Sequence, residues 1–250
     1  MNLLLGITEL VLCFSGVIVM DRLFGKKGLF VWMALAVVFA NIQVSKQIDL
    51  GSISVSLGNV LFASTYLATD ILNEKYGDKA SKNAVKLAAA ALVLYIAFAQ
   101  ITLAFVPNAY DAVDPSLKVV FAMSARITIA SGFMFIVSNW CDVILYQKIK
   151  EKTGERFMWF RNNISTVVCN CLENFAFSIL AFAGVYPVSY CIEMAIAGSI
   201  IEMMIAVCDT PFLYLSKALY KRSGILLEDD GTDAITTDSA ETAPAHEVNV

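Results

Sequence analysis

The chain has 250 residues, of which 58% are hydrophobic and only 16% charged, and its net charge is −4 at pH 7. Soluble domains contain about 45–50% hydrophobic and about 25% charged residues. The composition therefore excludes a soluble enzyme, a nucleic-acid-binding protein and a secreted disulfide scaffold. It favours a chain made mostly of membrane helices, each of about 20 residues.

Seven apolar segments are long enough to span a bilayer. In chain order they are residues 3–20, 28–48, 53–74, 86–106, 119–145, 162–183 and 188–214. The first segment contains Glu9 and lacks both a basic leading region and a small-residue cleavage site, so it does not resemble a signal peptide. The predicted fold class is an all-α polytopic membrane helix bundle with six core transmembrane helices and one additional N-terminal helix.

The segments predict three regions. Residues 1–27 form the additional helix and an inner loop, residues 28–222 form a six-helix core, and residues 223–250 form a tail. The tail contains seven acidic residues, no Lys or Arg and no hydrophobic pattern. We therefore expect it to be disordered and solvated.

The basic residues predict the orientation in the cell (inner or plasma) membrane. Fifteen of the 18 Lys and Arg residues lie in four alternate connections, namely 21–27, 75–86, 146–161 and 215–222. Since Lys and Arg gather on the cytoplasmic side of membrane proteins, the C-terminus is predicted to be cytoplasmic. The N-terminus lies outside if the first segment crosses the membrane.

No motif for catalysis, metal or nucleotide binding is apparent. The only histidine is His246 in the tail, and the six cysteines form no Cys/His cluster. The phosphate-binding pattern GxxxxGK[ST] is absent, and the predicted core has no Ser/His pair. We expect a protein that is not an enzyme and has no cofactor, no metal site and no catalytic residues.

Polar residues inside the predicted spans mark a candidate binding site, because a charge at the bilayer centre costs at least about 2.5 kcal/mol and usually faces the bundle interior. Glu173 and Glu202 fall near the middle of their spans, and helical phase groups each with further polar residues. Together they predict a cavity for a small polar solute. The candidate substrate-binding residues are Asn59, Tyr66, Asn162, Asn170, Glu173 and Glu202.

A second set of charged residues predicts a gate or ion-pair network near the cytoplasmic side. Its members are Asp70, Glu74, Asp142, Arg126 and Arg161. We expect Asp70 and Glu74 to pair with basic residues of the inner loops, Arg161 first. For the acidic residues at the cytoplasmic end, snorkelling or simple interfacial ion pairing is the open alternative.

Four sequence runs resemble the queuosine precursor transporter family. They are ANIQVSK at 40–46, DILNEKYG at 70–77, WCD at 140–142 and WFRNNIST at 159–166, and the resemblance covers roughly residues 28–222. It implies six core helices like those of the substrate-binding subunits of energy-coupling-factor vitamin transporters. It also implies import of 7-deazaguanine bases such as preQ0, preQ1 or queuine for the tRNA modification queuosine. Ala63 and Glu173 stand where many family members have proline and aspartate.

The polar residues fit that ligand class independently. A guanine-like edge presents two adjacent N–H donors that a carboxylate accepts, and Asn amides complement the neighbouring carbonyl and ring nitrogen. The expected partners are a purine-like base, the lipid bilayer and, as a candidate coupling ion, protons, with no nucleic acid. Two alternatives stay open: a substrate-binding subunit that needs a separate ATPase, and a non-transporting membrane assembly protein.

Overall fold

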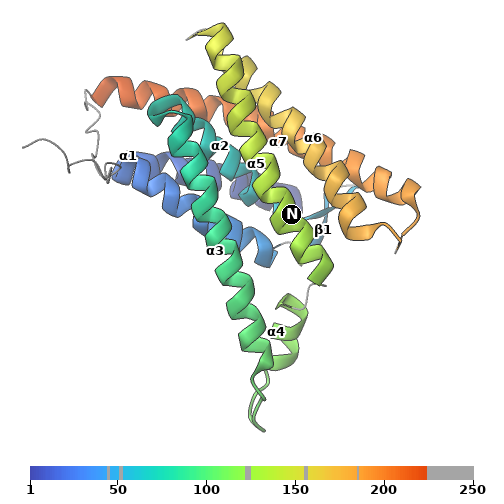
Figure 1. The fold of residues 1–250 in the computed structure, drawn as a ribbon. Helices are drawn as coiled ribbons and strands as arrows, with labels where there is room; N and C mark the ends of the chain where they lie inside the picture. Colours follow the sequence, from blue (N-terminus) through green and yellow to red (C-terminus); the bar gives the residue numbers. More distant parts are fainter. Residues whose placement is uncertain (44–45, 51–52, 122–124, 155–156, 185, 224–250) are drawn as a thin grey trace, which may run out of the picture.

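The computed structural model describes residues 1–43, 46–50, 53–121, 125–154, 157–184 and 186–223 (Figure 1). In chain order its elements are α1 (Asn2–Gln43), β1 (Gln47–Leu50), β2 (Ile53–Ser56), α2 (Asn59–Tyr76), α3 (Asp78–Ala104), α4 (Asp114–Phe121), α5 (Ala125–Thr153), α6 (Met158–Phe182) and α7 (Val188–Ser223). Among the described residues, α1, α3, α5, α6 and α7 contain stretches long and apolar enough to cross a membrane. The predicted helical membrane bundle is confirmed.

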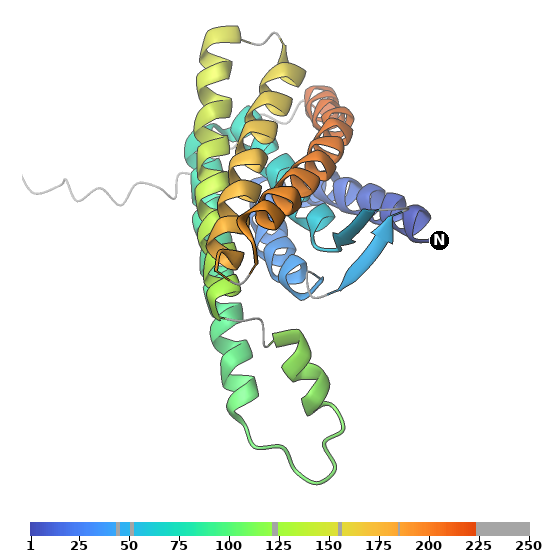
Figure 2. The same ribbon diagram turned by 90° about the vertical axis from the view of Figure 1, so that its right-hand side faces the viewer.

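Helix α1 is a hairpin of two helical arms that turn at Gly25 (Figure 2). Gly25 has φ 56° and ψ −138°, a conformation that favours glycine because it has no Cβ. The arms run back along each other, since Gln43 donates a hydrogen bond to Glu9 Oε1 at 2.7 Å. Further along, Gly16 leaves room for the Trp32 ring. The turn falls within the predicted inner loop 21–27.

A β-hairpin occupies the end of the second predicted span and the start of the third. Strand β1 pairs antiparallel with β2, with Ile48 opposite Val55. Residues 47–56 alternate polar and apolar side chains around Gly51-Ser52, which is the pattern of a strand pair rather than of a helix. The predicted bounds 28–48 and 53–74 were therefore wrong at this junction.

The predicted bounds of the fifth span were also wrong. Residues 119–121 belong to the short helix α4, and α5 begins at Ala125. At its other end α5 continues to Thr153, through residues expected to form a loop. Both views show α4 and the adjoining end of α3 extending away from the bundle (Figures 1 and 2).

Helix α2 is the centre of the bundle. It packs against α1, α3, α5 and α7, and every residue from Ala63 to Asn73 is buried. Because protein surrounds it, α2 can carry polar side chains that would be costly in contact with lipid.

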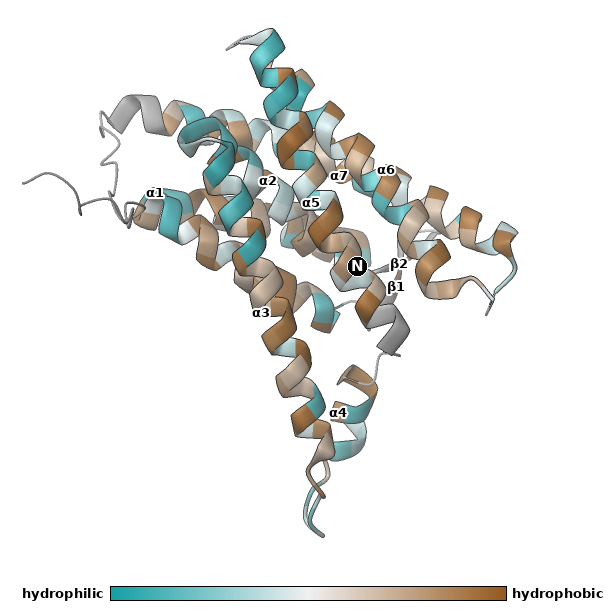
Figure 3. Cartoon of the chain, viewed as in Figure 1, coloured by the Kyte–Doolittle hydropathy of each residue, from teal (hydrophilic) through white to brown (hydrophobic). Residues whose placement is uncertain are grey.

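The outer faces of the surrounding helices have the opposite character. Large apolar side chains such as Leu94, Phe98 and Val168 are at least half exposed. Figure 3 shows hydrophobic residues along the middle of α3 and hydrophilic ones at its start and at the far end of α5. Extensive exposed apolar surface together with a polar interior is the pattern of a protein surrounded by lipid.

Candidate functional site

A cavity of about 120 Å³ lies where α2 begins and where α1, α5, α6 and α7 approach it. Polar and aromatic side chains dominate its wall. The lining residues are Ala40, Asn41, Gly58, Asn59, Phe62, Ser131, Glu173, Asn174, Phe177 and Glu202. The cavity thus brings together three of the predicted substrate-binding residues, Asn59, Glu173 and Glu202, from three different helices.

The two cavity carboxylates are each held by a neighbouring donor. Tyr66 Oη donates to Glu173 Oε2 at 2.7 Å, and Asn174 Nδ2 donates to Glu202 Oε2 at 2.6 Å. Gly198 of α7 makes the second contact possible, because a Cβ there would lie 2.5 Å from Asn174 Oδ1. The small residue lets α6 approach α7 closely enough for Asn174 to reach Glu202.

Other predicted site residues lie deeper in the bundle, away from the cavity wall. Asn162 Nδ2 donates to Asp209 Oδ1 at 2.6 Å. One turn further along α6, Thr166 Oγ1 donates to Asp142 Oδ1 at 3.4 Å. Asn170, which lies one more turn toward the cavity, is 1% exposed. The sequence pattern had suggested that Asn162 and Asn170 line the cavity. In the structure they instead continue the polar face of α6 inward from it.

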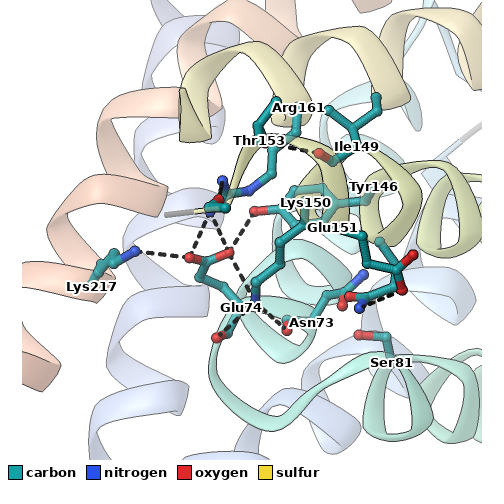
Figure 4. A network of polar contacts seen from close by, with 12 residues as sticks. Asn73, Glu74, Ser81, Tyr146, Ile149, Lys150, Glu151, Thr153, Arg161 and Lys217 are labelled. Atoms are coloured by element: carbon teal, nitrogen blue, oxygen red, sulfur yellow. Dashed lines mark hydrogen bonds and ion pairs between the residues drawn. The ribbon is translucent and has the colours of Figure 1, made fainter. Parts of the chain in front are cut away.

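Four polar side chains surround Glu74 at the end of α2, and we call these five residues the Glu74 cluster (Figure 4). Arg161 Nη2 lies 2.7 Å from both carboxylate oxygens of Glu74, and Lys217 Nζ lies 2.9 Å from Oε1. Lys150 Nζ lies 3.4 Å from Oε2, to which Tyr146 Oη donates at 3.2 Å. The cluster ties together α2, α5, α6 and α7.

Arg161 is enclosed within this cluster, with 0% of its side chain exposed. Its Nη1 donates to the carbonyl oxygen of Gly154 at 2.9 Å, and its guanidinium group lies over the Tyr146 ring at 5.5 Å. A buried guanidinium needs such a set of acceptors to offset the loss of water.

The pair of Glu74 with Arg161 agrees with the expectation for Glu74, whereas Asp70 is placed differently. Arg161 pairs with Glu74 and not with Asp70, which is 1% exposed and has no hydrogen-bond partner for either carboxylate oxygen within the described part of the chain. Asp142 contacts Thr166. Arg126 belongs to α5, but its side chain lies outside the described residues.

Sequence reasoning missed several residues of both sites. Asn174 follows Glu173 directly, but a step of 100° takes it off the polar face used for the prediction. Lys150 and Lys217 carried a signal, since both lie in the basic inner regions. Tyr146 carried none, because an aromatic residue at the end of a span is ordinarily part of the interfacial belt.

A second ion pair lies at the same end of α2. Lys75 Nζ contacts Asp21 Oδ2 at 2.5 Å, and Ser216 Oγ donates to the same oxygen at 2.8 Å. Arg22 of α1 also reaches the carbonyl oxygen of Leu219 on α7. Residues from three of the four basic regions therefore meet the end of α7 at one end of the bundle, as expected if all four lie on one side of the membrane.

The apolar exterior, the polar interior and the long apolar helices define a multi-pass membrane protein with a cavity inside its helix bundle. The family described as "Putative vitamin uptake transporter" matches residues 56–216. The chain belongs to this family of membrane transporters. It is also 34% identical over 197 residues to a Bacillus subtilis (strain 168) protein named "Probable queuosine precursor transporter", a match that covers 78% of this chain and 86% of that protein. No solved structure gives a significant match.

Proposed function

We propose that this protein is a carrier that imports 7-deazaguanine precursors of queuosine, such as preQ0, preQ1 or queuine, for tRNA modification. The name of the Bacillus subtilis relative supports this substrate class. The observation that carries the proposal is the pair of carboxylates, Glu173 and Glu202, on the wall of one cavity with three asparagines.

The cavity offers a complementary group for each part of a flat purine-like base. A carboxylate accepts hydrogen bonds from the two adjacent N–H donors of a guanine-like edge. We assign this role to Glu173, whose carboxylate is oriented by a hydrogen bond from Tyr66. The amides of Asn41 and Asn59 complement the ring carbonyl and nitrogen. Phe62 and Phe177 line the same cavity. Aromatic side chains can stack on the flat face of any nucleobase.

The second carboxylate suits precursors that carry a positive charge. An aminomethyl substituent, as in preQ1, is a cation at neutral pH and donates a charge-assisted hydrogen bond to a carboxylate. Glu202, fixed by Asn174, is the residue that we assign to this group. We assign Asn162 and Asn170, which are buried on the polar face of α6 beyond the cavity, to the route by which the base leaves toward the other side of the membrane.

In the proposed orientation the C-terminus is cytoplasmic, and the Glu74 cluster closes the cytoplasmic end. Asn59 at the cavity and Glu74 are 15 residues apart on α2, which corresponds to roughly 22 Å along the helix. The cavity then belongs to the outer half of the bundle. Import requires the Glu74 cluster to open after the base has bound, so Arg161 acts as a gate residue.

The first test measures queuosine in tRNA of a host that cannot make its own precursors. The gene is expected to restore queuosine when preQ0, preQ1 or queuine is added at low concentration. Glu173→Gln is expected to require a higher concentration of base. Glu193→Gln, which changes an exposed glutamate of α7, serves as the matched control. Restoration by none of the bases would contradict the proposed function.

The second test separates the carrier from the two alternatives. Purified protein is reconstituted alone into lipid vesicles, and uptake of a labelled base is measured. A carrier takes up the base without an added ATPase. A substrate-binding subunit binds the base but transports nothing alone, and an assembly protein does neither.

A further inference from the structure

Three aspartates lie buried between the cavity and the Glu74 cluster, and we call them the aspartate triad. Asp70 of α2, Asp142 of α5 and Asp209 of α7 are each at most 1% exposed. Asp142 and Asp209 contact Thr166 and Asn162, which lie one turn apart on α6, and Asp70 lies one turn before Glu74 on α2. Within the described residues, none of the three forms a salt bridge with a Lys or Arg side chain.

Two residues of the triad and two asparagines of α6 have buried acceptor atoms without a hydrogen-bond partner in the described part of the chain. Both carboxylate oxygens of Asp70 lack a partner among the described residues, as does Oδ2 of Asp142. The side-chain oxygens of Asn162 and Asn170, which are at most 1% exposed, are unpaired as well. Such a concentration of buried acceptors favours the binding of a donor or a cation, because burying acceptors unpaired is costly.

Glu74 provides a direct contrast. It follows Asp70 by one helical turn, but Arg161, Lys150 and Lys217 compensate its charge. Within the described residues, three cations thus bind one carboxylate of α2, and none is bonded to the other.

Titratable or charged side chains surround Asp70 from α2 itself and from three further helices. They are Glu74 on α2, Asp142 and Tyr146 on α5, Arg161 and Cys169 on α6, and Asp209 on α7. The other two helices add no free charge in the described residues: Asp21 of α1 is paired with Lys75, and α3 contributes the uncharged Ser81, which bonds the carbonyl oxygen of Thr69. The one cation in this set, Arg161, is bonded to Glu74.

We propose that the aspartate triad binds a monovalent cation, a proton or a sodium ion, that enters from the cavity side and crosses the membrane together with the base. The cation supplies the missing donor or positive charge at Asp70 and Asp142. When the Glu74 cluster opens, Arg161 is released one turn from Asp70 and displaces the cation toward the cytoplasm. Cation binding is independent of the substrate, whereas its coupling to import rests on the proposed function.

The first experiment needs no substrate. Thermal unfolding of the purified protein in detergent is followed over a pH series without sodium, and at a fixed alkaline pH with sodium replacing N-methyl-D-glucamine. A cation that binds only the folded protein raises the unfolding midpoint, by about 5 °C or more at roughly 100 times its dissociation constant. A rise on acidification identifies a proton, and a rise with sodium at constant pH identifies sodium.

Asp70→Asn is the informative variant, because its amide provides an N–H donor in place of the cation. We expect this variant to fold and to have an unfolding midpoint equal to or above that of the wild type without the cation. Its unfolding midpoint should depend much less on the cation than that of the wild type. Asp78→Asn alters the partly exposed pair with Lys82 and should keep that dependence. A wild-type midpoint independent of both cations, or full dependence in Asp70→Asn, would overturn the proposal.

The second experiment tests coupling in vesicles. An inward gradient of the identified cation is expected to drive accumulation of labelled base at least tenfold over that without a gradient, and Asp70→Asn should abolish this while retaining exchange of base across the membrane. If no base is transported but the midpoint still depends on the cation, the proposed substrate fails and the cation site stands. If base accumulates equally in wild type and Asp70→Asn, coupling through the triad is refuted and the carrier function stands.

Discussion

Arg161 and Glu74 lie 87 residues apart in the chain, yet one guanidinium nitrogen of Arg161 lies 2.7 Å from both carboxylate oxygens of Glu74. The contact joins α6 to α2 in a place where Arg161 has no exposed surface and Glu74 is 5% exposed. Replacing one residue of such a buried ion pair is costly, because the charge of the other residue stays buried without its partner.

Glu74→Gln should therefore destabilise the protein by about 3 kcal/mol, in the range for breaking a buried ion pair. Asp78→Asn, which removes a partly exposed i,i+4 pair, should change stability by about 0.5 kcal/mol or less. Unfolding of the purified proteins in detergent measures both. Combining Glu74→Gln with Arg161→Gln should cost less than the sum of the single changes by about 0.5–3 kcal/mol. Strict additivity would show that the two residues are not energetically coupled.

The same variant tests the gate. Because the cavity and the Glu74 cluster lie at opposite ends of α2, Glu74→Gln should leave the affinity for the base within about twofold while slowing uptake at least tenfold. Equilibrium binding and initial uptake rates, measured on the same preparation, separate the two effects. A loss of affinity as large as the loss of uptake would place Glu74 in the binding site.

Glu173→Gln keeps the shape of the side chain but removes the charge that strengthens its hydrogen bonds. We expect a loss of about 1.5–3 kcal/mol in binding free energy, which is roughly a 10- to 100-fold higher dissociation constant. Isothermal titration with preQ0 or preQ1 provides the measurement, and Glu193→Gln should bind as the wild type does. An unchanged dissociation constant in Glu173→Gln would mean that this carboxylate binds something other than the base.

Gly25→Ala tests the turn of α1. At φ 56° and ψ −138° an alanine is strained, and its Cβ would lie 3.3 Å from Tyr76 Oη, so we expect a loss of about 1–3 kcal/mol in stability. Gly6→Ala is the matched control, since nothing lies within 4 Å of a Cβ there and alanine favours the helix. Equal unfolding midpoints for the two variants would contradict the hairpin.

Truncation after Ser223 should leave uptake and protein level unchanged. The tail carries no pattern for packing, and its seven acidic residues are unsuited to the bilayer. Immunoblotting of membranes and the uptake assay check the two quantities separately. Lost uptake at a normal protein level would assign the tail a role in transport.

Some features were predictable because they depend on short stretches of chain. The turn of α1 fell in the expected loop, and the basic regions gathered at one end of the bundle. The β-hairpin was missed because residues 47–48 and 53–56 were assigned by hydropathy to the ends of two predicted membrane spans. Their period of two and the central Gly51-Ser52 were the signals that could have identified it.

The sequence by itself determined that this is a helical membrane protein, which parts of the chain contain most of its spans and to which family it belongs. These follow from hydropathy, charge and short motifs, which need no knowledge of how helices meet. The tertiary structure alone decided that Arg161 pairs with Glu74 rather than Asp70, and that Asn174 reaches Glu202 past Gly198. Such choices depend on the rotation and depth of each helix against its neighbours. Those are fixed by close packing across the whole bundle, because one helical turn of about 5.4 Å is enough to exchange one partner for another.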